Sequence, residues 1–348
     1  MHITFKRLLF LFLLPQISWA QNPDQIDFKS KFDQAVADYQ KFESDHGHYI
    51  QTPNVNMHYS TWGNPQDTPL VWVHGSYQNS TEILEIVDRL VAAHIYVIAI
   101  DYYGHGLTDI PDKDVSIYHV ADDIDYLLDH LHIDQTIIGG WSRGGTIVSA
   151  FYDSYPEKVK GIILEDGGSA NWLLPRQMLS QEEVKNWYTK MSQYMNHTTF
   201  ETQFDAFKHY YKEQDSDSQF WRLAYIKSNE NDFWAWNLGL SEWLEESTIE
   251  DGVNGVFRTS TCSQFKSSTL FLQPLIVYRN LDVPMLIFDP TKDDANGFMN
   301  LTKQNQQLKS AHPELITYLV YVDASHSVHY QQPDKFTTDV LAFINSLK

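Results

Sequence analysis

The chain alternates short apolar runs with stretches of helical periodicity, and this rhythm constrains its fold more than any other feature. The runs typical of β-strands lie at residues 48–52, 56–63, 69–75, 96–101, 135–141, 159–166, 283–290 and 315–324. Helical patterns lie near residues 80–93, 120–131, 143–155, 297–310 and 333–347. Nearly continuous apolar strands between helices indicate strands that are buried on both faces. The rhythm therefore predicts an α/β fold with a mostly parallel sheet and helices on both of its faces.

The rhythm stops between residues 169 and 280, where the sequence becomes helical and aromatic. This segment holds six of the ten tryptophans, and its helical patterns lie at 182–195, 204–214 and 231–246. Since the strand pattern resumes at residue 283, we interpret residues 169–280 as a helical cap inserted between two parts of one core, 21–168 and 281–348. Aromatic residues at helical spacing are also typical of an ordinary second core.

The first twenty residues have the three-part layout of a secretory signal peptide. Two basic residues precede an apolar run from Leu8 to Leu14, and small residues follow at Ser18 and Ala20. The run is shorter than the roughly 20 residues that a membrane-spanning helix needs. We therefore expect residues 1–20 to direct export to a secreted or periplasmic location, with cleavage near Ala20 and no membrane span. An uncleaved anchor is the alternative.

Charge and cysteine content argue against several classes of function. The net charge of −20 disfavours nucleic acid or an anionic membrane as a partner, although acidity also serves solubility. The single cysteine, Cys262, excludes an intramolecular disulfide and a cysteine-rich zinc site. The sequence has no HExxH motif and no EF-hand loop, so we predict no metal, no cofactor and a small-molecule substrate. In a eukaryotic route, Asn79, Asn196 and Asn300 would be glycosylation acceptors.

The stretch IIGGWSRGGT, residues 137–146, places a serine among four glycines at a junction between a predicted strand and a predicted helix. Gly140, Ser142 and Gly144 form a G-x-S-x-G motif, in which the serine is held on a strained turn. Glycine removes the Cβ atoms that would clash where the helix packs close to the sheet. The motif and its context predict that Ser142 is a catalytic nucleophile.

A serine nucleophile requires a histidine base and a carboxylate that fixes the tautomer of this histidine. Asp293 follows the strand at 283–290, where an acid loop is expected, and we choose it as the acid. Asp289 and Asp294 share its loop, and Asp166 could serve from the end of the neighbouring strand. These three residues remain open as alternatives.

His326 follows the last predicted strand and is the expected base, so that the triad is Ser142, Asp293 and His326. His329 is near enough in sequence to compete, but a histidine at its position more often packs or meets solvent. The tetrahedral intermediate also needs hydrogen-bond donors. We expect these to be the backbone N–H of Arg143, at the start of the following helix, and that of Ser76, in the loop after the strand at 69–75.

These motifs together resemble the α/β-hydrolase family, in particular its members with a helical cap, such as esterases, proline iminopeptidases and C–C bond hydrolases. The resemblance extends over nearly the whole chain after residue 20. It rests on HG at His74 and Gly75, DYYGHGLTD at 101–109, the elbow at Ser142, VPMLIFDPTKDD at 283–294 and SHSVHYQQPDKF at 325–336. It implies an α/β-hydrolase fold with an inserted helical cap.

Three departures from the family pattern affect the expected site. Thr108 stands where the loop at 101–109 usually has serine, and Ser325 replaces the glycine that usually precedes the histidine. Asp289 and Pro290 replace the pair that usually precedes the acid, which leaves the geometry of the acid loop open. Family members with an aspartate nucleophile, the epoxide hydrolases and haloalkane dehalogenases, are disfavoured by Ser142.

The resulting functional prediction is a serine hydrolase that cleaves an ester of a small or medium apolar or aromatic substrate. Trp172, just after the strand at 159–166, is the expected cap residue in the wall of the pocket. An iminopeptidase-like aminopeptidase is the alternative, and it would need carboxylates such as Glu165 and Asp166 or acids of the cap to hold an ammonium group. A non-catalytic binding protein on the same fold is the third possibility. The sequence gives no oligomeric state.

Overall fold

A computed structural model describes residues 26–192, 199–212, 219–228, 233–234, 248–292 and 301–347 of the chain. The expected signal peptide, residues 1–20, lies outside this part of the chain, as do Asp293, Asp294, Asn196 and Asn300. The predicted cap boundaries at residues 169 and 280 stay predictions.

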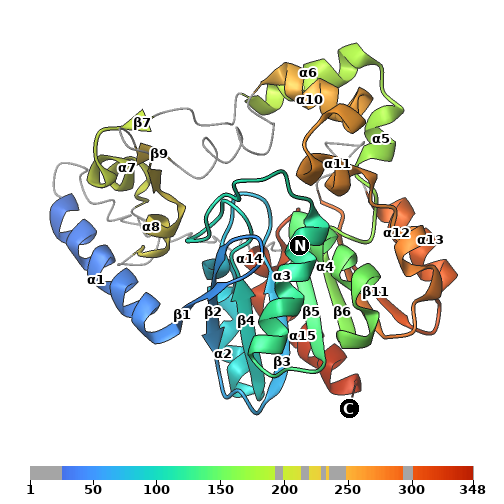
Figure 1. Cartoon of the computed structure of the whole chain (residues 1–348), viewed down its shortest axis with the longest axis horizontal. Coiled ribbons are helices and arrows are strands. Elements are labelled where there is room, and N and C mark those ends of the chain that lie inside the picture. Colours follow the sequence, from blue (N-terminus) through green and yellow to red (C-terminus); the bar gives the residue numbers. More distant parts are fainter. Residues whose placement is uncertain are drawn as a thin grey trace, which may run out of the picture.

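The centre of the molecule is an eight-stranded sheet in the order β1-β2-β4-β3-β5-β6-β10-β11 (Figure 1). Its strands are β1 (Gly47–Gln51), β2 (Asn56–Trp62), β3 (Thr68–Val73), β4 (Ile95–Ile100), β5 (Thr136–Trp141), β6 (Val159–Glu165), β10 (Met285–Pro290) and β11 (Ile316–Tyr321). The strands from β4 to β11 are parallel to one another, and β1 and β2 are antiparallel additions at one edge. Each strand coincides with one of the eight predicted runs, so the predicted sheet is confirmed.

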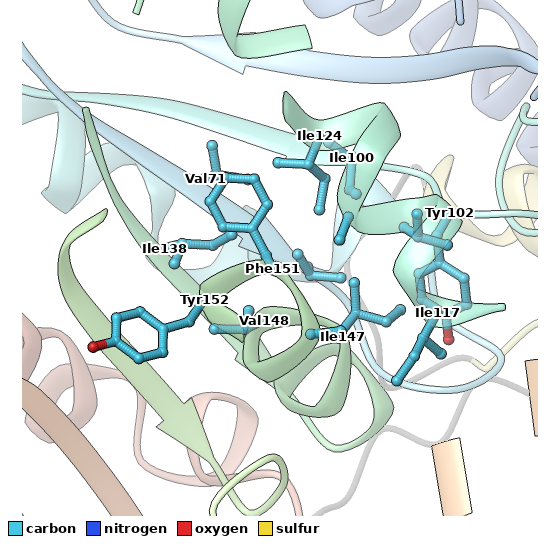
Figure 2. Close-up of a cluster of buried hydrophobic side chains, with 14 of the residues drawn as sticks. Val71, Ile100, Tyr102, Ile117, Ile124, Ile138, Ile147, Val148, Phe151 and Tyr152 are labelled. Atoms are coloured by element: carbon cyan, nitrogen blue, oxygen red, sulfur yellow. The ribbon is translucent and has the colours of Figure 1, made fainter. Parts of the chain in front are cut away.

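Helices cover both faces of the sheet, as the sequence predicts. On one face lie α3 (Ile117–His130), α4 (Arg143–Ser154) and α13 (Thr302–Ala311), and on the other lie α2 (Leu84–Ala92) and α15 (Pro333–Ser346). Short elements η2 (Ser80–Ile83), η3 (Pro156–Lys158), α12 (Pro274–Val277), η5 (Tyr278–Asn280) and α14 (Val328–Gln331) complete the core. Figure 2 shows the first face, where side chains of α3 and α4 pack on Val71, Ile100 and Ile138.

Alternation of side chains along the strands supplies a core to each face. In β3, Leu70 and Trp72 pack with α2 and α15, whereas Val71 and Val73 pack with α3 and α4. A strand directs successive side chains to opposite faces, so a continuous apolar run fits a sheet that is covered twice. Burying each such side chain contributes about 1.5–3 kcal/mol to stability. The parallel strands therefore fix one edge of the sheet, at their carboxyl ends, as a rigid platform.

The structure contains a helix that the sequence analysis did not predict, α1 (Phe28–His46). It begins after Asp27, whose carboxylate accepts the N–H of Ser30 at 3.1 Å and caps the helix. The ring of Phe32 packs edge-on against Phe207 at 5.5 Å. Thus α1 precedes the core in sequence but packs against residues of the predicted cap.

The described parts of the insert form two groups (Figure 1). One group contains α5 (Leu173–Gln177), α6 (Gln181–Ser192), α10 (Ile249–Phe257), η4 (Thr259–Thr261) and α11 (Gln264–Phe271). The other contains α7 (Gln203–Tyr210), α8 (Trp221–Tyr225) and a small antiparallel sheet of β7 (Thr199–Phe200), β9 (Phe233–Trp234) and β8 (Lys227–Ser228), and it packs against α1. The helix predicted over 231–246 is wrong at Phe233 and Trp234, because these residues pair with β7 and β8 as a strand.

A buried ionic cluster joins α1 to the core. The Nδ1 atom of His58 lies 2.7 Å from the Asp101 carboxylate, and Nε2 lies 3.0 Å from that of Glu43. Burial opposes a charge on His58, but Asp101 and Glu43 outweigh it and raise the pKa of His58 to about 9. The imidazolium is therefore the form that bridges the two carboxylates at neutral pH.

This cluster should make stability fall in mildly alkaline solution. Because the folded-state pKa of His58 is raised, its contribution is complete below pH 6.5 and is lost as the pH rises through 9. The loss amounts to about 3 kcal/mol. Urea unfolding at pH 6.5 and 9.5 measures this change. The free energy of unfolding of the wild type should fall by this amount between the two pH values, whereas that of His58→Gln should not show this decrease. The exposed His130→Gln variant should behave as the wild type, and an equal pH dependence in all three proteins would contradict the assignment.

Candidate active site

Ser142 lies at the turn between β5 and α4, at the carboxyl edge of the sheet. It has φ 55° and ψ −120°, a strained conformation for a residue with a side chain. The carbonyl oxygen of Glu165 at the end of β6 accepts its N–H at 2.9 Å. A Cβ atom on Gly140 would lie 2.6 Å from the backbone of Gly144, and one on Gly144 would lie 2.0 Å from the carbonyl oxygen of Val73. The flanking glycines therefore allow the close packing that this turn requires.

His326 connects the serine to a carboxylate. Its Nε2 atom lies 2.9 Å from the Ser142 Oγ atom, and its Nδ1 atom lies 2.5 Å from the Asp166 Oδ2 atom. When Nδ1–H donates to the carboxylate, Nε2 can accept the serine proton, which is the tautomer that a general base needs. His326 follows β11, and the indole Nε1–H of Trp141 donates to its carbonyl oxygen at 2.6 Å.

The carboxylate 2.5 Å from His326 Nδ1 is that of Asp166, one of the alternatives to Asp293, the acid chosen from the sequence. Asp166 follows β6, which pairs with β10, so the two loops leave neighbouring strands at the same edge. Asp293 itself lies outside the described residues. Asp289 is buried and accepts hydrogen bonds from Tyr318 and, at 3.1 Å, from Thr302. The order of serine, acid and histidine along the chain is the same with Asp166 as with Asp293.

Burial is the main influence on Asp166. Its side chain is 14% exposed, against 40% for that of His326. Desolvation raises the pKa of Asp166, while the hydrogen bond and charge of His326 act against this rise. A poorly solvated carboxylate interacts strongly with its partner, so Asp166 can stabilise an imidazolium that forms on His326.

The loop after β3 and the start of α4, which carry the predicted N–H donors, lie close together. Gly144 approaches the carbonyl oxygens of Val73 and His74, so the N-terminus of α4 lies against the end of β3. The hydroxyl of Tyr102 donates to the Gly75 carbonyl oxygen at 3.2 Å and also faces Ser76 and Arg143. The first N–H groups of a helix have no acceptor within it and carry partial positive charge. The assignment of the Ser76 and Arg143 N–H groups as oxyanion donors stays a prediction.

The loop after β4 supports this arrangement. A Cβ on Gly106, at φ 50°, would collide with the Asp101 carboxylate, which accepts the N–H of Leu107 at 3.0 Å. Thr108 donates its hydroxyl to the Asp101 carbonyl oxygen at 2.7 Å and accepts the N–H of His58 at 2.8 Å. Both hydrogen bonds use the hydroxyl group, which serine and threonine share, so threonine in place of the usual serine keeps both of them.

The structure places Trp172 beside the histidine. The two rings meet edge to face, with 6.2 Å between the centroids of Trp172 and His326. The indole also packs against the cluster that joins α5, α6, α10 and α11. Trp172 therefore lies between the cap and the reacting groups, where a substrate side chain can contact it.

His329 and Glu165, which the sequence analysis named as alternatives, bind each other. Both side chains are buried, and His329 Nδ1 lies 2.8 Å from a carboxylate oxygen of Glu165. Neither is therefore available to a substrate, and Asp166 is occupied by His326. The Asn79 side chain is also buried and accepts the N–H of Thr81 at 2.9 Å, which leaves no room for a glycan on the folded protein.

Within the described residues, no group of three or more His, Cys, Asp or Glu side chains could hold a metal ion. Among the helices of the same residues, none combines the length and the apolarity that crossing a membrane requires. The prediction that no metal or cofactor takes part stays a prediction.

A family model described as the alpha/beta hydrolase fold matches residues 68–333. A human serine hydrolase-like protein is 27% identical over 138 residues, which are 39% of this chain and 64% of the relative. The sn-1-specific diacylglycerol lipase of Danio rerio is 30% identical over 115 residues, 32% of this chain and 36% of the relative. The chain thus matches less than two thirds of the length of these relatives.

Solved structures give the same fold. A carboxylesterase of Nitrososphaera gargenis superposes with a TM-score of 0.59 at 17% identity, over 86% of this chain and 98% of that one. A thermophilic esterase of Thermogutta terrifontis superposes with a TM-score of 0.55 at 17% identity, over 86% and 98% of the two chains. At this identity the similarity concerns the fold alone.

Proposed function

The chain belongs to the α/β-hydrolase family, and on that premise we propose that it is a hydrolase that cleaves carboxylic esters with Ser142 as nucleophile, His326 as base and Asp166 as orienting acid. The observation that carries the proposal is the chain of contacts from Ser142 Oγ through His326 to the Asp166 carboxylate, at 2.9 and 2.5 Å. Asp166 replaces Asp293 in the proposed triad for this reason.

In the first half-reaction, Ser142 Oγ attacks the carbonyl carbon of the ester while its proton moves to His326 Nε2. The carbonyl oxygen becomes an oxyanion, which the N–H groups of Ser76 and Arg143 stabilise. His326 then gives the proton to the leaving alcohol, and the acyl group remains on Ser142. In the second half-reaction His326 takes a proton from water, whose oxygen attacks the acyl carbon. The bond between Ser142 Oγ and the acyl carbon then breaks, His326 returns the proton to Oγ, and the acid is released.

The occupied carboxylates favour an ester over an aminopeptidase substrate. An iminopeptidase-like enzyme needs carboxylates that face the substrate ammonium group. Glu165 is bound to His329 and Asp166 to His326, so the two candidates of the core are committed elsewhere. In the described part of the cap, Asp251 caps α10 through Thr248. The assembled triad argues in turn against a non-catalytic binding protein.

The first twenty residues support a further part of the proposal, that the protein is exported. Their basic start, apolar run and small-residue end are those of a cleaved signal peptide. N-terminal sequencing of the protein recovered from its native host should begin near Gln21, and a start at Met1 would count against export with cleavage.

Activity profiling tests the ester proposal and its apolar pocket. We expect hydrolysis of p-nitrophenyl esters, and little or none of proline and other aminoacyl arylamides. Each methylene buried at the transition state contributes about 0.8 kcal/mol, or roughly fourfold in kcat/KM. Activity should therefore rise steeply from acetate to longer acyl chains. Faster cleavage of the arylamides would favour the aminopeptidase, and a flat chain-length series would contradict the apolar pocket.

Trp172→Ala should reduce that chain-length dependence. The variant loses the indole beside His326, so kcat/KM should fall by tenfold or more for long or aromatic acyl esters and by much less for acetate. Trp187→Ala, in α6, where the Arg176 guanidinium lies 5.2 Å from the centroid of the indole, is the matched control and should keep the wild-type profile. Equal losses for acetate and longer esters would exclude Trp172 as a selecting residue.

A further inference from the structure

A second set of residues lies directly beneath the proposed triad and is connected to it through the chain. Trp141 precedes Ser142, Glu165 precedes Asp166, and His329 is three residues after His326. The indole of Trp141 packs against both histidines, with ring centroids 5.0 Å from His326 and 5.3 Å from His329. Trp141, Glu165 and His329 therefore adjoin the three loops that carry the reacting groups, which are those of Ser142, Asp166 and His326.

Glu165 joins two of these loops. Its carboxylate accepts the backbone N–H of His329 at 2.9 Å and faces the ring Nδ1 atom of the same residue at 2.8 Å. Its backbone carbonyl oxygen accepts the N–H of Ser142 at 2.9 Å. One residue thus holds the nucleophile turn with its main chain and the start of α14, just after His326, with its side chain.

Glu82 holds a further loop, the one after β3 that carries Gly75 and Ser76. Its carboxylate accepts the N–H of Gly75 at 2.9 Å through one oxygen and the indole N–H of Trp72 at 2.9 Å through the other. Gly75 precedes Ser76, whose N–H is the proposed oxyanion donor. A Cβ on Gly75 would lie 2.3 Å from the Trp141 ring, so this loop and the nucleophile strand are in close contact.

The electrostatic influence of both carboxylates extends to His329. Burial opposes its charge, but Glu165, and after it Glu82, outweigh burial and raise the pKa of His329. Burial raises the pKa of Glu82 to about 7, and the charge of His329 acts against this rise. All three side chains are at most 1% exposed. A buried charge that loses its partner is costly, so removing one member affects the other two.

We propose that Glu82, Glu165 and His329 form a buried positioning network. This network fixes the relative positions of the loop after β3 with its oxyanion donor, the nucleophile turn and the catalytic histidine. This inference rests on the proposed function, because it assigns the network to the same reaction. Glu165 and His329 do not touch the substrate and act through Ser142 and His326. Displacement of reacting groups by about 1 Å is enough to lower a rate by about 10²-fold.

The test is the rate of fluorophosphonate labelling for each titratable active site in the full chain. In Glu165→Gln and in His329→Gln we expect full or nearly full titration with a labelling rate, and a kcat for ester hydrolysis, lowered about 10²-fold and a KM within about threefold of the wild type. A merely structural role would reduce the number of titratable sites and leave the rate for each site unchanged, which would overturn the inference.

Two further proteins sharpen the test. Asp123→Asn removes another buried carboxylate, one bonded to Asn54 at 2.8 Å and to Tyr103, and should keep the wild-type rate for each site. The double variant Glu165→Gln with His329→Gln should lose less than the product of the two single losses, because the pair acts as a unit. Multiplicative losses would overturn the inference, and His329→Gln alone suffices for the rate comparison if Glu165→Gln does not fold.

The outcome for the wild type separates this inference from the proposed function. If the probe labels Ser142 and the network variants react at the wild-type rate, only the network is wrong. If the wild type is not labelled at all, the proposed function fails first.

Discussion

Replacing Ser142 with alanine should abolish ester hydrolysis and all covalent labelling by a fluorophosphonate. In the proposed mechanism the Oγ atom is the nucleophile and passes its proton to His326 Nε2, which lies 2.9 Å away. Loss of the nucleophile of a serine hydrolase costs on the order of 10⁶-fold in kcat. The fold should persist, because the strain at φ 55° lies in the backbone and alanine adds no atoms. Urea unfolding should therefore give a stability within about 1 kcal/mol of the wild type.

The measurement is labelling followed by mass spectrometry of the modified peptide. In the wild type the modified peptide should contain Ser142, and Ser180→Ala, at an exposed serine of the cap, should label as the wild type does. Labelling of the Ser142→Ala protein at another residue would move the nucleophile elsewhere and contradict the proposed mechanism.

Local patterns in the sequence were sufficient to predict the sheet and the nucleophile turn. Each strand of the core carries an apolar run that fits its neighbours on both faces, so its position depends little on the rest of the chain. The turn at Ser142 is equally local, since the glycines at 140 and 144 are required by contacts that a Cβ would make within the strand–helix unit and with β3. The sheet and the turn can therefore both be predicted before any tertiary structure is known.

The carboxylate that contacts His326 could not be predicted in the same way. Asp166 and Asp293 follow adjacent strands, β6 and β10, and both choices give the same order along the chain. Which loop turns toward His326 depends on tertiary packing. A usable signal was the pair of glycines after Asp166: a Cβ on Gly167 would lie 2.0 Å from the Ser142 carbonyl oxygen. Glycines therefore mark the loop that approaches Ser142, as they also mark the turn at Ser142 itself.

The N-terminal helix and the cap show a second limit. The spacing of Phe28, Phe32, Ala35, Tyr39 and Phe42 is helical, so α1 could have been predicted. Its partners in the predicted cap could not, because they lie more than 150 residues later, as in the contact between Phe32 and Phe207. The strand at Phe233 and Trp234 has two residues, too few for periodicity to separate strand from helix.

The second large effect concerns Asp166. Asp166→Asn should lower kcat/KM for ester hydrolysis by about 10⁴-fold, because an asparagine amide can donate to His326 Nδ1 and so leave the proton on Nε2, the wrong tautomer for accepting the Ser142 proton. The variant should still fold, since the amide has nearly the shape of the carboxylate. Kinetics on a p-nitrophenyl ester, normalised to active sites titrated over long exposure to the probe, give the comparison.

Asp289→Asn and Asp293→Asn decide whether that loss is specific. The first removes a buried carboxylate that bonds to Tyr318 and Thr302, and the second removes the acid that was chosen from the sequence. Because Asp166 stays in place beside His326 Nδ1 in both variants, each should cost less than about tenfold for each titrated site, well under the loss expected for a wrong histidine tautomer. A loss at Asp293→Asn as large as that at Asp166→Asn would mean that the two carboxylates share the histidine during turnover. A loss at Asp293→Asn alone would return the acid to the loop after β10.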